Sequence, residues 1–313
     1  MPKCLVTGGA GFIGSNLVDE LIKRGDEVVI IDNLSTGRKE YINPKAKFYN
    51  IDICSKDDVK RVFQNESNSS EIDFVYHLAA QMDVRKSIKD PLFDNEVNVA
   101  GGYNIFNCAL KAKVKKVVFF STGGAIYGNV DSPADEEALP SPDSFYAAHK
   151  LTSEKHLEIL NKLYGQNYII LRPANIYGPR QYKGGEGAVA AVFTYNAFNN
   201  KESIVYGDGL QTRDFVYIDD VVEACLKSAE SDTQGIFNIG SGKEISVLEL
   251  IDVIEKINNK KFQYKHYKER IGEVRRSVLD CNKARELLNW RAKTDIKEGL
   301  EKTIDYFKNI LSL

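Results

Sequence analysis

A glycine-rich turn near the N-terminus, between an apolar strand and a helix, constrains this chain most. The predicted strand covers Lys3 to Thr7, and Gly8, Gly11 and Gly14 follow it in the spacing G-x-x-G-x-x-G. Glycine suits this position because the backbone must bend sharply and approach a phosphate closely, while the helix N-terminus offers unpaired N–H groups to an anion. The turn therefore predicts a nucleotide-binding site at the end of the first strand.

Short apolar runs alternate with helical patterns over the first 170 residues, which is typical of strand–helix–strand units. The predicted strands are Lys3 to Thr7, Glu27 to Asp32, Lys47 to Asp52, Phe74 to Leu78, Val114 to Ser121 and Tyr168 to Pro173. The predicted helices are Phe12 to Arg24, Lys56 to Asn65, Pro91 to Lys113 and Ser144 to Tyr164. In the last helix, apolar residues at positions 148, 151, 157, 160 and 163 predict the face toward the core.

These patterns predict an α/β protein with a doubly wound parallel sheet. Residues 1–173 form the predicted nucleotide-binding domain, to which the chain returns around residues 215–240. After residue 173 the elements become shorter and are separated by glycine-rich stretches. We therefore expect residues 174–313 to form a smaller α/β lobe that binds the substrate.

Composition excludes several classes of protein. The 42 Lys and Arg residues against 44 Asp and Glu residues give a net charge of −2, so no basic field indicates nucleic acid or an anionic membrane surface. No apolar run approaches the ~20 residues of a membrane span, and no signal peptide precedes the first strand, so we expect a cytoplasmic protein. The five cysteines (4, 54, 108, 225 and 281) are scattered, with no C-x-x-C pair and no histidine at ligand spacing, so we expect no metal site.

Asp32 sharpens the interpretation of the glycine turn. It stands 18 residues after Gly14, at the end of the second predicted strand. A carboxylate there can accept hydrogen bonds from both hydroxyls of a ribose, whereas it would repel a 2′-phosphate. The pattern therefore favours NAD over NADP, and we expect the nearby Arg38 to be solvated.

A tyrosine precedes a lysine by four residues at three places, of which only Tyr146 with Lys150 lies on a predicted helix. Pro44 disfavours a helix in the pair that begins at Tyr41, and the pair that begins at Tyr264 lies in a charged segment. Residues four apart share one helix face. Because a tyrosine has a reference pKa of ~10, it needs nearby positive charge to act as a base at neutral pH. The pair therefore predicts an acid–base site in which Lys150 and a bound nicotinamide lower the pKa of Tyr146.

With these residues the chain resembles the extended short-chain dehydrogenases/reductases, and among them the nucleotide-sugar epimerases of the UDP-galactose 4-epimerase type. The resemblance covers essentially the whole chain and implies a Rossmann-type fold. It is carried by residues 7–14, 32–37, 77–81, 121–128, 171–179, 206–209, 212–215, 237–240 and 270–273, with Asn98, Tyr146 and Lys150.

The resemblance implies an NAD site. Asp52 and Ile53 would flank the adenine, and Pro173 would touch the nicotinamide. The other implied NAD-binding residues are Gly8, Gly11, Phe12, Ile13, Gly14, Asp32, Asn33, Ser35, Thr36, Gly37, Leu78, Ala79, Ala80, Gln81, Asn98, Ser121, Tyr146 and Lys150.

The resemblance also implies a UDP-sugar site. Asn175, Arg213 and Arg270 would hold the diphosphate and nucleotide, a use of cations that suits a chain of low net charge. The other implied substrate contacts are Val189, Ile204 and Tyr206 at the uracil, with Val84, Thr122, Gly123, Tyr146 and Ser277.

The implied reaction is the 4-epimerisation of a UDP-hexose without net redox. Tyr146, as phenolate, takes the proton of the sugar 4′-hydroxyl while the 4′-hydride passes to NAD, and Lys150 holds the nicotinamide ribose. The 4-keto sugar then turns over and takes the hydride back on its other face. The family also implies a homodimer, joined by helices around residues 92–112 and 144–164 in a four-helix bundle.

One position departs from the family pattern. Many members carry a serine or threonine four residues before the Tyr-Gly that here is Tyr127–Gly128, and this hydroxyl hydrogen-bonds the sugar 4′-oxygen, but here the position is Gly123. Thr122 is the nearest hydroxyl, with Ser121 behind it. Strand neighbours point to opposite faces, so Thr122 can substitute only if the glycines bend the chain. Otherwise a water molecule makes the hydrogen bond to the sugar 4′-oxygen.

Other functions have less support from the sequence. Related dehydratases and decarboxylases carry acidic groups where this chain has Gly124 and Ala125, so epimerisation is favoured over elimination. A non-catalytic NAD-binding sensor would commonly lack the tyrosine or the lysine. A dehydrogenase of another alcohol would not need the nucleotide-directed arginines. In the family, a small residue seven positions after the arginine that matches Arg270 permits a 2′-N-acetyl group. The resemblance therefore implies that Ser277, at this position, allows that group to be accepted.

Overall fold

The computed structural model describes residues 1–181, 188–269 and 274–311. The chain forms two compact units. The first unit comprises Met1–Thr122, Ser144–Arg172 and Val222–Phe237, and the second comprises Gly123–Asp143, Pro173–Val221 and Asn238–Leu313. The division into a cofactor domain and a substrate lobe stays a prediction.

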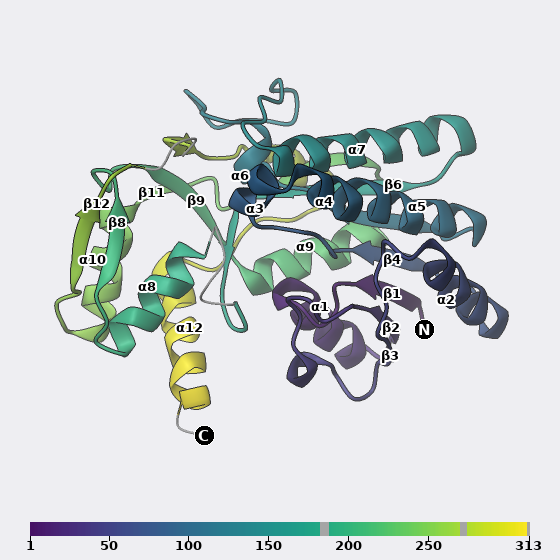
Figure 1. Ribbon diagram of the computed structural model, residues 1–313, viewed down its shortest axis with the longest axis horizontal. Helices are drawn as coiled ribbons and strands as arrows, with labels where there is room; N and C mark the ends of the chain where they lie inside the picture. The colour runs from purple at the N-terminus through teal and green to yellow at the C-terminus, as the bar shows by residue number, and fades with distance from the viewer. Residues whose placement is uncertain (182–187, 270–273, 312–313) are drawn as a thin grey trace. The chain divides into compact units, whose positions relative to one another are not determined.

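A seven-stranded sheet forms the centre of the first unit (Figure 1). The sequence predicts a parallel sheet and six of these strands, but not the strand at Gly235–Ile239. Its strand order is β10-β6-β5-β4-β1-β2-β3, and the pairs from β3 to β6 are parallel. The order therefore reverses between β1 and β4, which is where doubly wound sheets bind ligands. The strands are β1 (Lys3–Thr7), β2 (Glu27–Ile31), β3 (Lys47–Tyr49), β4 (Phe74–His77), β5 (Lys116–Phe120), β6 (Tyr168–Pro173) and β10 (Gly235–Ile239).

Helices cover both faces of this sheet (Figure 1). On one face α2 (Lys56–Ser69), α5 (Gly102–Lys111) and α7 (Phe145–Tyr164) pack over a core that includes Val75, Ile105 and Leu157. On the other face lie α1 (Phe12–Lys23) and α9 (Ile218–Glu230). The fold is therefore an α/β doubly wound sheet of Rossmann type.

The region predicted as one helix over Pro91 to Lys113 has three parts. These are α4 (Pro91–Asn95), the π-helix η2 (Glu96–Gly101) and α5. At the second junction, a Cβ atom on Gly101 would lie 2.8 Å from the Ile53 side chain, so the helix packs closely there. The short helix α3 (Val84–Lys89) and the turn η1 (Lys39–Tyr41) complete the named elements of this unit.

Helix α7 has clear ends but a partly unexpected buried face. The Ser144 side chain accepts a hydrogen bond from the Ala147 backbone N–H at its start, and Gly165 at its end has φ 72°. Leu157 and Leu160 are buried as predicted, whereas the prediction for Leu163 is wrong because this side chain is 63% exposed. Polar side chains complete the buried face instead, among them Lys150, Ser153 and Glu154. The apolar pattern failed because buried polar groups with partners replace apolar ones on this face.

The described part of the second unit contains two small sheets. One has the order β11-β9-β13, with β7 paired to β9, and the other pairs β12 with β8. Its strands are β7 (Asn175–Tyr177), β8 (Ser203–Tyr206), β9 (Thr212–Tyr217), β11 (Glu244–Ser246), β12 (Tyr264–Tyr267) and β13 (Arg276–Ser277). Its helices are α6 (Gly123–Ile126), α8 (Val189–Phe198), α10 (Val247–Asn258), α11 (Asn282–Leu287) and α12 (Ile296–Leu311). Within the described ranges of the chain, no helix is long and apolar enough to cross a membrane.

Candidate active site

The glycine turn brings the chain after β1 against the chain after β4. Gly8 has φ +72°, and a Cβ atom on it would lie 2.8 Å from the Ala79 backbone nitrogen. A Cβ atom on Gly14 would collide with the Gly8 carbonyl oxygen. Both positions therefore require glycine, and the contact stands where the strand order reverses.

The Asp32 carboxylate is fixed by the backbone. It accepts hydrogen bonds from the N–H groups of Ala10 at 3.0 Å and Leu34 at 2.8 Å. Burial raises the pKa of Asp32, and the two backbone donors act against this rise. A Cβ atom on Gly37 would lie 2.8 Å from Asp32 Oδ1, so glycine there leaves room beside the carboxylate.

A pocket opens beside Asp32 in the first unit. Nearby, Asn33 Nδ2 donates a hydrogen bond to Asp52 Oδ2 at 2.8 Å. Sequence reasoning missed Ile31, Ile51 and Val97, whose apolar side chains give no binding signal of their own. The pocket is lined by Gly8, Ile31, Asp32, Asn33, Ser35, Thr36, Ile51, Asp52, Ile53, Ala79, Ala80 and Val97.

These residues fit NAD. The glycine turn gives a close backbone approach that a Cβ atom would block, and the Asp32 carboxylate can accept hydrogen bonds from ribose hydroxyls. Of the other predicted NAD contacts, Phe12 and Ile13 begin α1, Leu78 follows β4 and Pro173 ends β6.

Thr122, Tyr146 and Lys150 lie together in the first unit. The Thr122 side chain is hydrogen-bonded to the Tyr146 hydroxyl. The strand β5 ends at Phe120 and α6 begins at Gly123, so strand alternation does not apply to Thr122. Thr122 therefore lies between the strand and the helix, where its side chain reaches the Tyr146 hydroxyl.

Burial controls the ionisation of this pair. It raises the pKa of Tyr146 to about 12, to which the Asp94 charge adds, while the Thr122 hydrogen bond lowers it. Burial also lowers the pKa of Lys150 to about 7, against the charges of Glu154 and Asp94. The expected lowering of the Tyr146 pKa is thus absent from the protein by itself, because burial disfavours the charged form of both partners.

A second buried cluster continues one turn along α7, and sequence reasoning missed it. Glu154 accepts hydrogen bonds from Arg172 Nε at 3.0 Å and Arg172 Nη2 at 2.6 Å, and also from the Ser121 hydroxyl. Tyr146, Lys150 and Glu154 are each four residues apart, so the spacing was an available signal. The predicted NAD contact Ser121 therefore has its hydroxyl bonded to Glu154.

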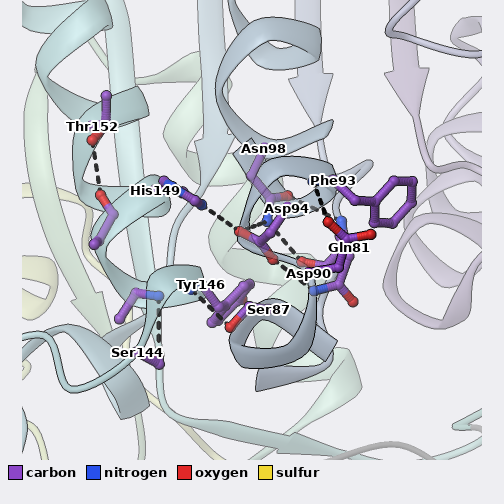
Figure 2. A network of polar contacts seen from close by, with 12 residues as sticks. Gln81, Ser87, Asp90, Phe93, Asp94, Asn98, Ser144, Tyr146, His149 and Thr152 are labelled. Carbon is purple, nitrogen blue, oxygen red and sulfur yellow. Dashed lines mark hydrogen bonds and ion pairs between the residues drawn. The ribbon is translucent and has the colours of Figure 1, made fainter. Parts of the chain in front are cut away.

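The side chains of Gln81 and Asn98, both predicted NAD contacts, also have protein partners. Gln81 Nε2 lies 2.6 Å from Asp94 Oδ2, and Asn98 Nδ2 lies 3.0 Å from Asp94 Oδ1 (Figure 2). Their partner Asp94 has no exposed surface. Val84, a predicted substrate contact, begins α3 in the same unit.

In the second unit, β9 brings three predicted substrate residues together. Asn175 on β7 pairs with Phe215 of β9, and Ser277 on β13 pairs with Arg213 of β9. Ile204 is on β8. The remaining predicted residues are Val189, which begins α8, Gly123, which begins α6, and Arg270, which lies outside the described residues.

A pocket of the second unit contains the predicted uracil contact Tyr206. Gln211 and Arg275, which sequence reasoning missed, line it together with Gly207, Glu269 and Val274. Arg275 is held by Asp208, with Nη1 to Oδ1 at 2.6 Å and Nη2 to Oδ2 at 2.8 Å. Among the residues with described coordinates, no three His, Cys, Asp or Glu side chains gather as a metal site requires.

The sheet topology, the glycine turn and the Tyr146–Lys150 pair define an extended short-chain dehydrogenase/reductase. Residues 4–240 match the NAD dependent epimerase/dehydratase family. The chain belongs to this family.

Similar proteins carry a more specific name. The UDP-glucose 4-epimerase of Mycolicibacterium smegmatis is 38% identical, over 98% of this chain and 99% of that protein. The crystal structure of the Thermotoga maritima UDP-glucose 4-epimerase with UDP-glucose has a TM-score of 0.95 and 41% identity, covering 99% of each chain. The Thermus thermophilus UDP-glucose 4-epimerase in complex with NAD has a TM-score of 0.93 and 38% identity, covering 98% of this chain and 99% of that one.

Proposed function

We propose that this chain is an NAD-dependent 4-epimerase of UDP-hexoses that interconverts UDP-galactose and UDP-glucose. The hydrogen bond between Thr122 and the Tyr146 hydroxyl carries the proposal, because it places a second hydroxyl at the base that the reaction needs. Lys150 stands one helical turn further along α7. The names of the similar proteins support the same activity.

In this mechanism Tyr146, as phenolate, accepts the proton of the sugar 4′-hydroxyl and later returns it. When bound, NAD supplies a hydride acceptor and donor for C4 and adds a positive charge. Thr122 donates a hydrogen bond that favours the phenolate of Tyr146. Lys150, when protonated, favours the same phenolate and holds a ribose hydroxyl.

The magnitude of the pKa shift explains why the protein alone is not poised to react. Bringing the Tyr146 pKa from about 12 to neutrality requires roughly 7 kcal/mol in favour of the phenolate. The Thr122 hydrogen bond acts in this direction, and so does positive charge on Lys150. We therefore propose that Tyr146 becomes a base only when cofactor and substrate are bound.

The substrate residues of the second unit would bind the anionic part of the UDP-sugar. Asn175 pairs with Phe215, two residues along β9 from Arg213, so we propose that both side chains serve one diphosphate. Arg270 is proposed for the same role from the sequence alone. Ile204, Tyr206 and Val189 are proposed at the uracil from the resemblance.

Dehydration or decarboxylation is the second candidate, because the family contains dehydratases as well as epimerases. Elimination needs an acidic group near the reacting carbon, and Gly124 with Ala125 occupies the segment where the related enzymes carry it. A Cβ atom on Gly124 would lie 3.1 Å from Asn175 Oδ1, so a side chain there would require Asn175 to shift by a few tenths of an ångström. The missing acidic group favours the epimerase.

The test is an activity assay on the purified protein without added NAD. We expect bound cofactor and conversion of UDP-galactose to UDP-glucose. Stoichiometric consumption of added NAD would contradict the epimerase and indicate a net dehydrogenase. Bound NAD without any turnover would indicate the non-catalytic sensor.

We also propose that the N-acetylhexosamine pair is accepted. Ser277 is small and paired with Arg213, a proposed substrate contact, so its short side chain would obstruct an acetyl group less than a larger one. Turnover of UDP-N-acetylglucosamine at a rate comparable to UDP-glucose is expected. The variant Ser277→Tyr should lose the acetylated substrate first, and equal loss of both sugars would contradict this role.

A homodimer is part of the proposal. The helices α4, α5 and α7 carry exposed apolar side chains, of which Leu92 is 80%, Leu163 63% and Ile159 51% exposed. A second copy could bury these residues in a four-helix bundle. The cytoplasmic location stays a prediction.

A further inference from the structure

A buried carboxylate next to the proposed catalytic pair has no part in the mechanism above. Asp94 on α4 has no exposed surface, and three side chains surround its carboxylate (Figure 2). Gln81 and Asn98 donate from neutral amides at 2.6 Å and 3.0 Å. The third partner is His149, whose Nδ1 lies 2.7 Å from Asp94 Oδ1.

His149 differs from the two amides because it can take up a proton. A carboxylate only accepts hydrogen bonds, so Nδ1 of the neutral ring must carry the hydrogen and Nε2 keeps its lone pair. The His149 side chain is 16% exposed, so it can exchange protons with solvent. The charge of the Asp94–His149 pair can therefore change from −1 to 0 without breaking the hydrogen bond.

This charge is placed to act on the catalytic pair. His149 lies on α7 between Tyr146 and Lys150. After burial, Asp94 is the next contribution to the raised pKa of Tyr146. For Lys150, burial lowers the pKa, and the charges of Glu154 and Asp94 oppose this.

Other charged or titratable groups lie on the elements that pack against α7. On the packed helix α3, Lys86 lies 4.1 Å from the centre of the Phe93 ring. Glu96 of η2 is exposed, and Tyr103 of α5 meets the ring of His156 edge to face. Asp94 is therefore the charged group that shares a hydrogen bond with His149.

We propose that Asp94 and His149 act as a charge-setting pair for Tyr146 and Lys150. A proton on His149 offsets the Asp94 carboxylate and makes the Tyr146 hydroxyl easier to ionise. Both are positioning residues, and the inference rests on the proposed function.

Two near-isosteric variants separate charge from structure. Asp94→Asn removes the negative charge, although its N–H groups must face at least one of the three donors and will lower stability. His149→Asn keeps an N–H donor close to the place of Nδ1 but cannot take up a proton. The pH profile of kcat/KM is measured for both variants and the unmodified chain.

The two variants are expected to move the profile in opposite directions. Asp94→Asn lowers the pKa of both Tyr146 and Lys150. The acid limb and the alkaline limb of the kcat/KM profile therefore both move to lower pH, by about one pH unit. His149→Asn leaves the Asp94 charge without its proton partner, so the acid limb moves to higher pH. A loss of rate with unmoved limbs in both variants would show a structural role and overturn the proposal.

A second measurement does not depend on turnover. With NAD bound, the ionisation of Tyr146 is followed by ultraviolet absorbance as the pH is raised. The signal is the difference between each variant and the same variant carrying Tyr146→Phe. The midpoint should fall in Asp94→Asn and rise in His149→Asn, in step with the acid limb of the pH profile. An unchanged midpoint in Asp94→Asn contradicts the charge effect. Absence of UDP-hexose turnover in the unmodified chain contradicts the proposed function and leaves this titration valid.

Discussion

At the scale of single residues, the candidate site consists of a small number of hydroxyl and charged groups in one buried space. The family position Gly123 has no side chain, and the Thr122 hydroxyl contacts Tyr146 instead. The chain leaves β5 after Phe120 and begins α6 at Gly123, which turns Thr122 toward the tyrosine. We therefore propose that Thr122 supplies the missing hydroxyl from the neighbouring position.

Substitution of Thr122 tests this assignment. In Thr122→Ala the hydrogen bond that lowers the Tyr146 pKa is lost, so we expect kcat to fall about tenfold to a hundredfold at neutral pH. The acid limb of the pH profile should also move to higher pH, because less phenolate forms. Thr122→Ser keeps the hydroxyl and is the matched control. Full activity of the alanine variant would show that a water serves the sugar instead.

At the scale of elements, α7 organises the site. One face of it presents Tyr146, Lys150 and Glu154, and its first turn is anchored to α3, because the Tyr146 backbone N–H donates to Ser87 Oγ at 3.1 Å (Figure 2). The Ser144 side chain caps the same turn. The position of the tyrosine thus depends on the start of the helix.

Loss of this cap should be measurable. Ser144→Ala removes the acceptor for the Ala147 N–H, and we expect it to lower the free energy of unfolding by about 1 kcal/mol. Ser144→Asp restores an acceptor and should regain stability. Urea denaturation of the unmodified chain, Ser144→Ala and Ser144→Asp measures these differences. Equal denaturation midpoints for Ser144→Ala and the unmodified chain would contradict the cap.

The sequence predicted the glycine turn, Asp32 and the Tyr146–Lys150 pair because each has a fixed spacing within or between neighbouring elements. It did not predict Asp94 or the Glu154–Arg172 pair. Their burial follows from packing between elements, and a charged residue on a helix usually faces solvent. Packing between elements also decides the exposure of Leu163, an apolar residue that belongs to the predicted stripe of α7 but is exposed.

At the scale of the whole molecule, apolar side chains of α4, α5 and α7 remain exposed in the single chain. Leu163 and Ile159 lie one turn apart on α7. Replacing both by glutamate should dissociate the proposed dimer, because two charges per copy would be buried at the interface. The measurement is sedimentation velocity.

A surface change elsewhere provides the control. Lys23→Glu on α1 alters a side chain that is 76% exposed and should leave the dimer intact. If the double glutamate variant sediments like the unmodified chain, the interface lies on another face. If the unmodified chain is a monomer, the four-helix bundle is wrong.

The central claim is a 4-epimerisation in which the hydrogen removed from C4 of the sugar returns to the same carbon. The most direct test uses UDP-galactose that carries deuterium at C4, converted by the purified protein in ordinary water and followed by nuclear magnetic resonance. The account predicts UDP-glucose that retains the deuterium at C4. Loss of the deuterium to solvent, or a product dehydrated at the sugar, would contradict it.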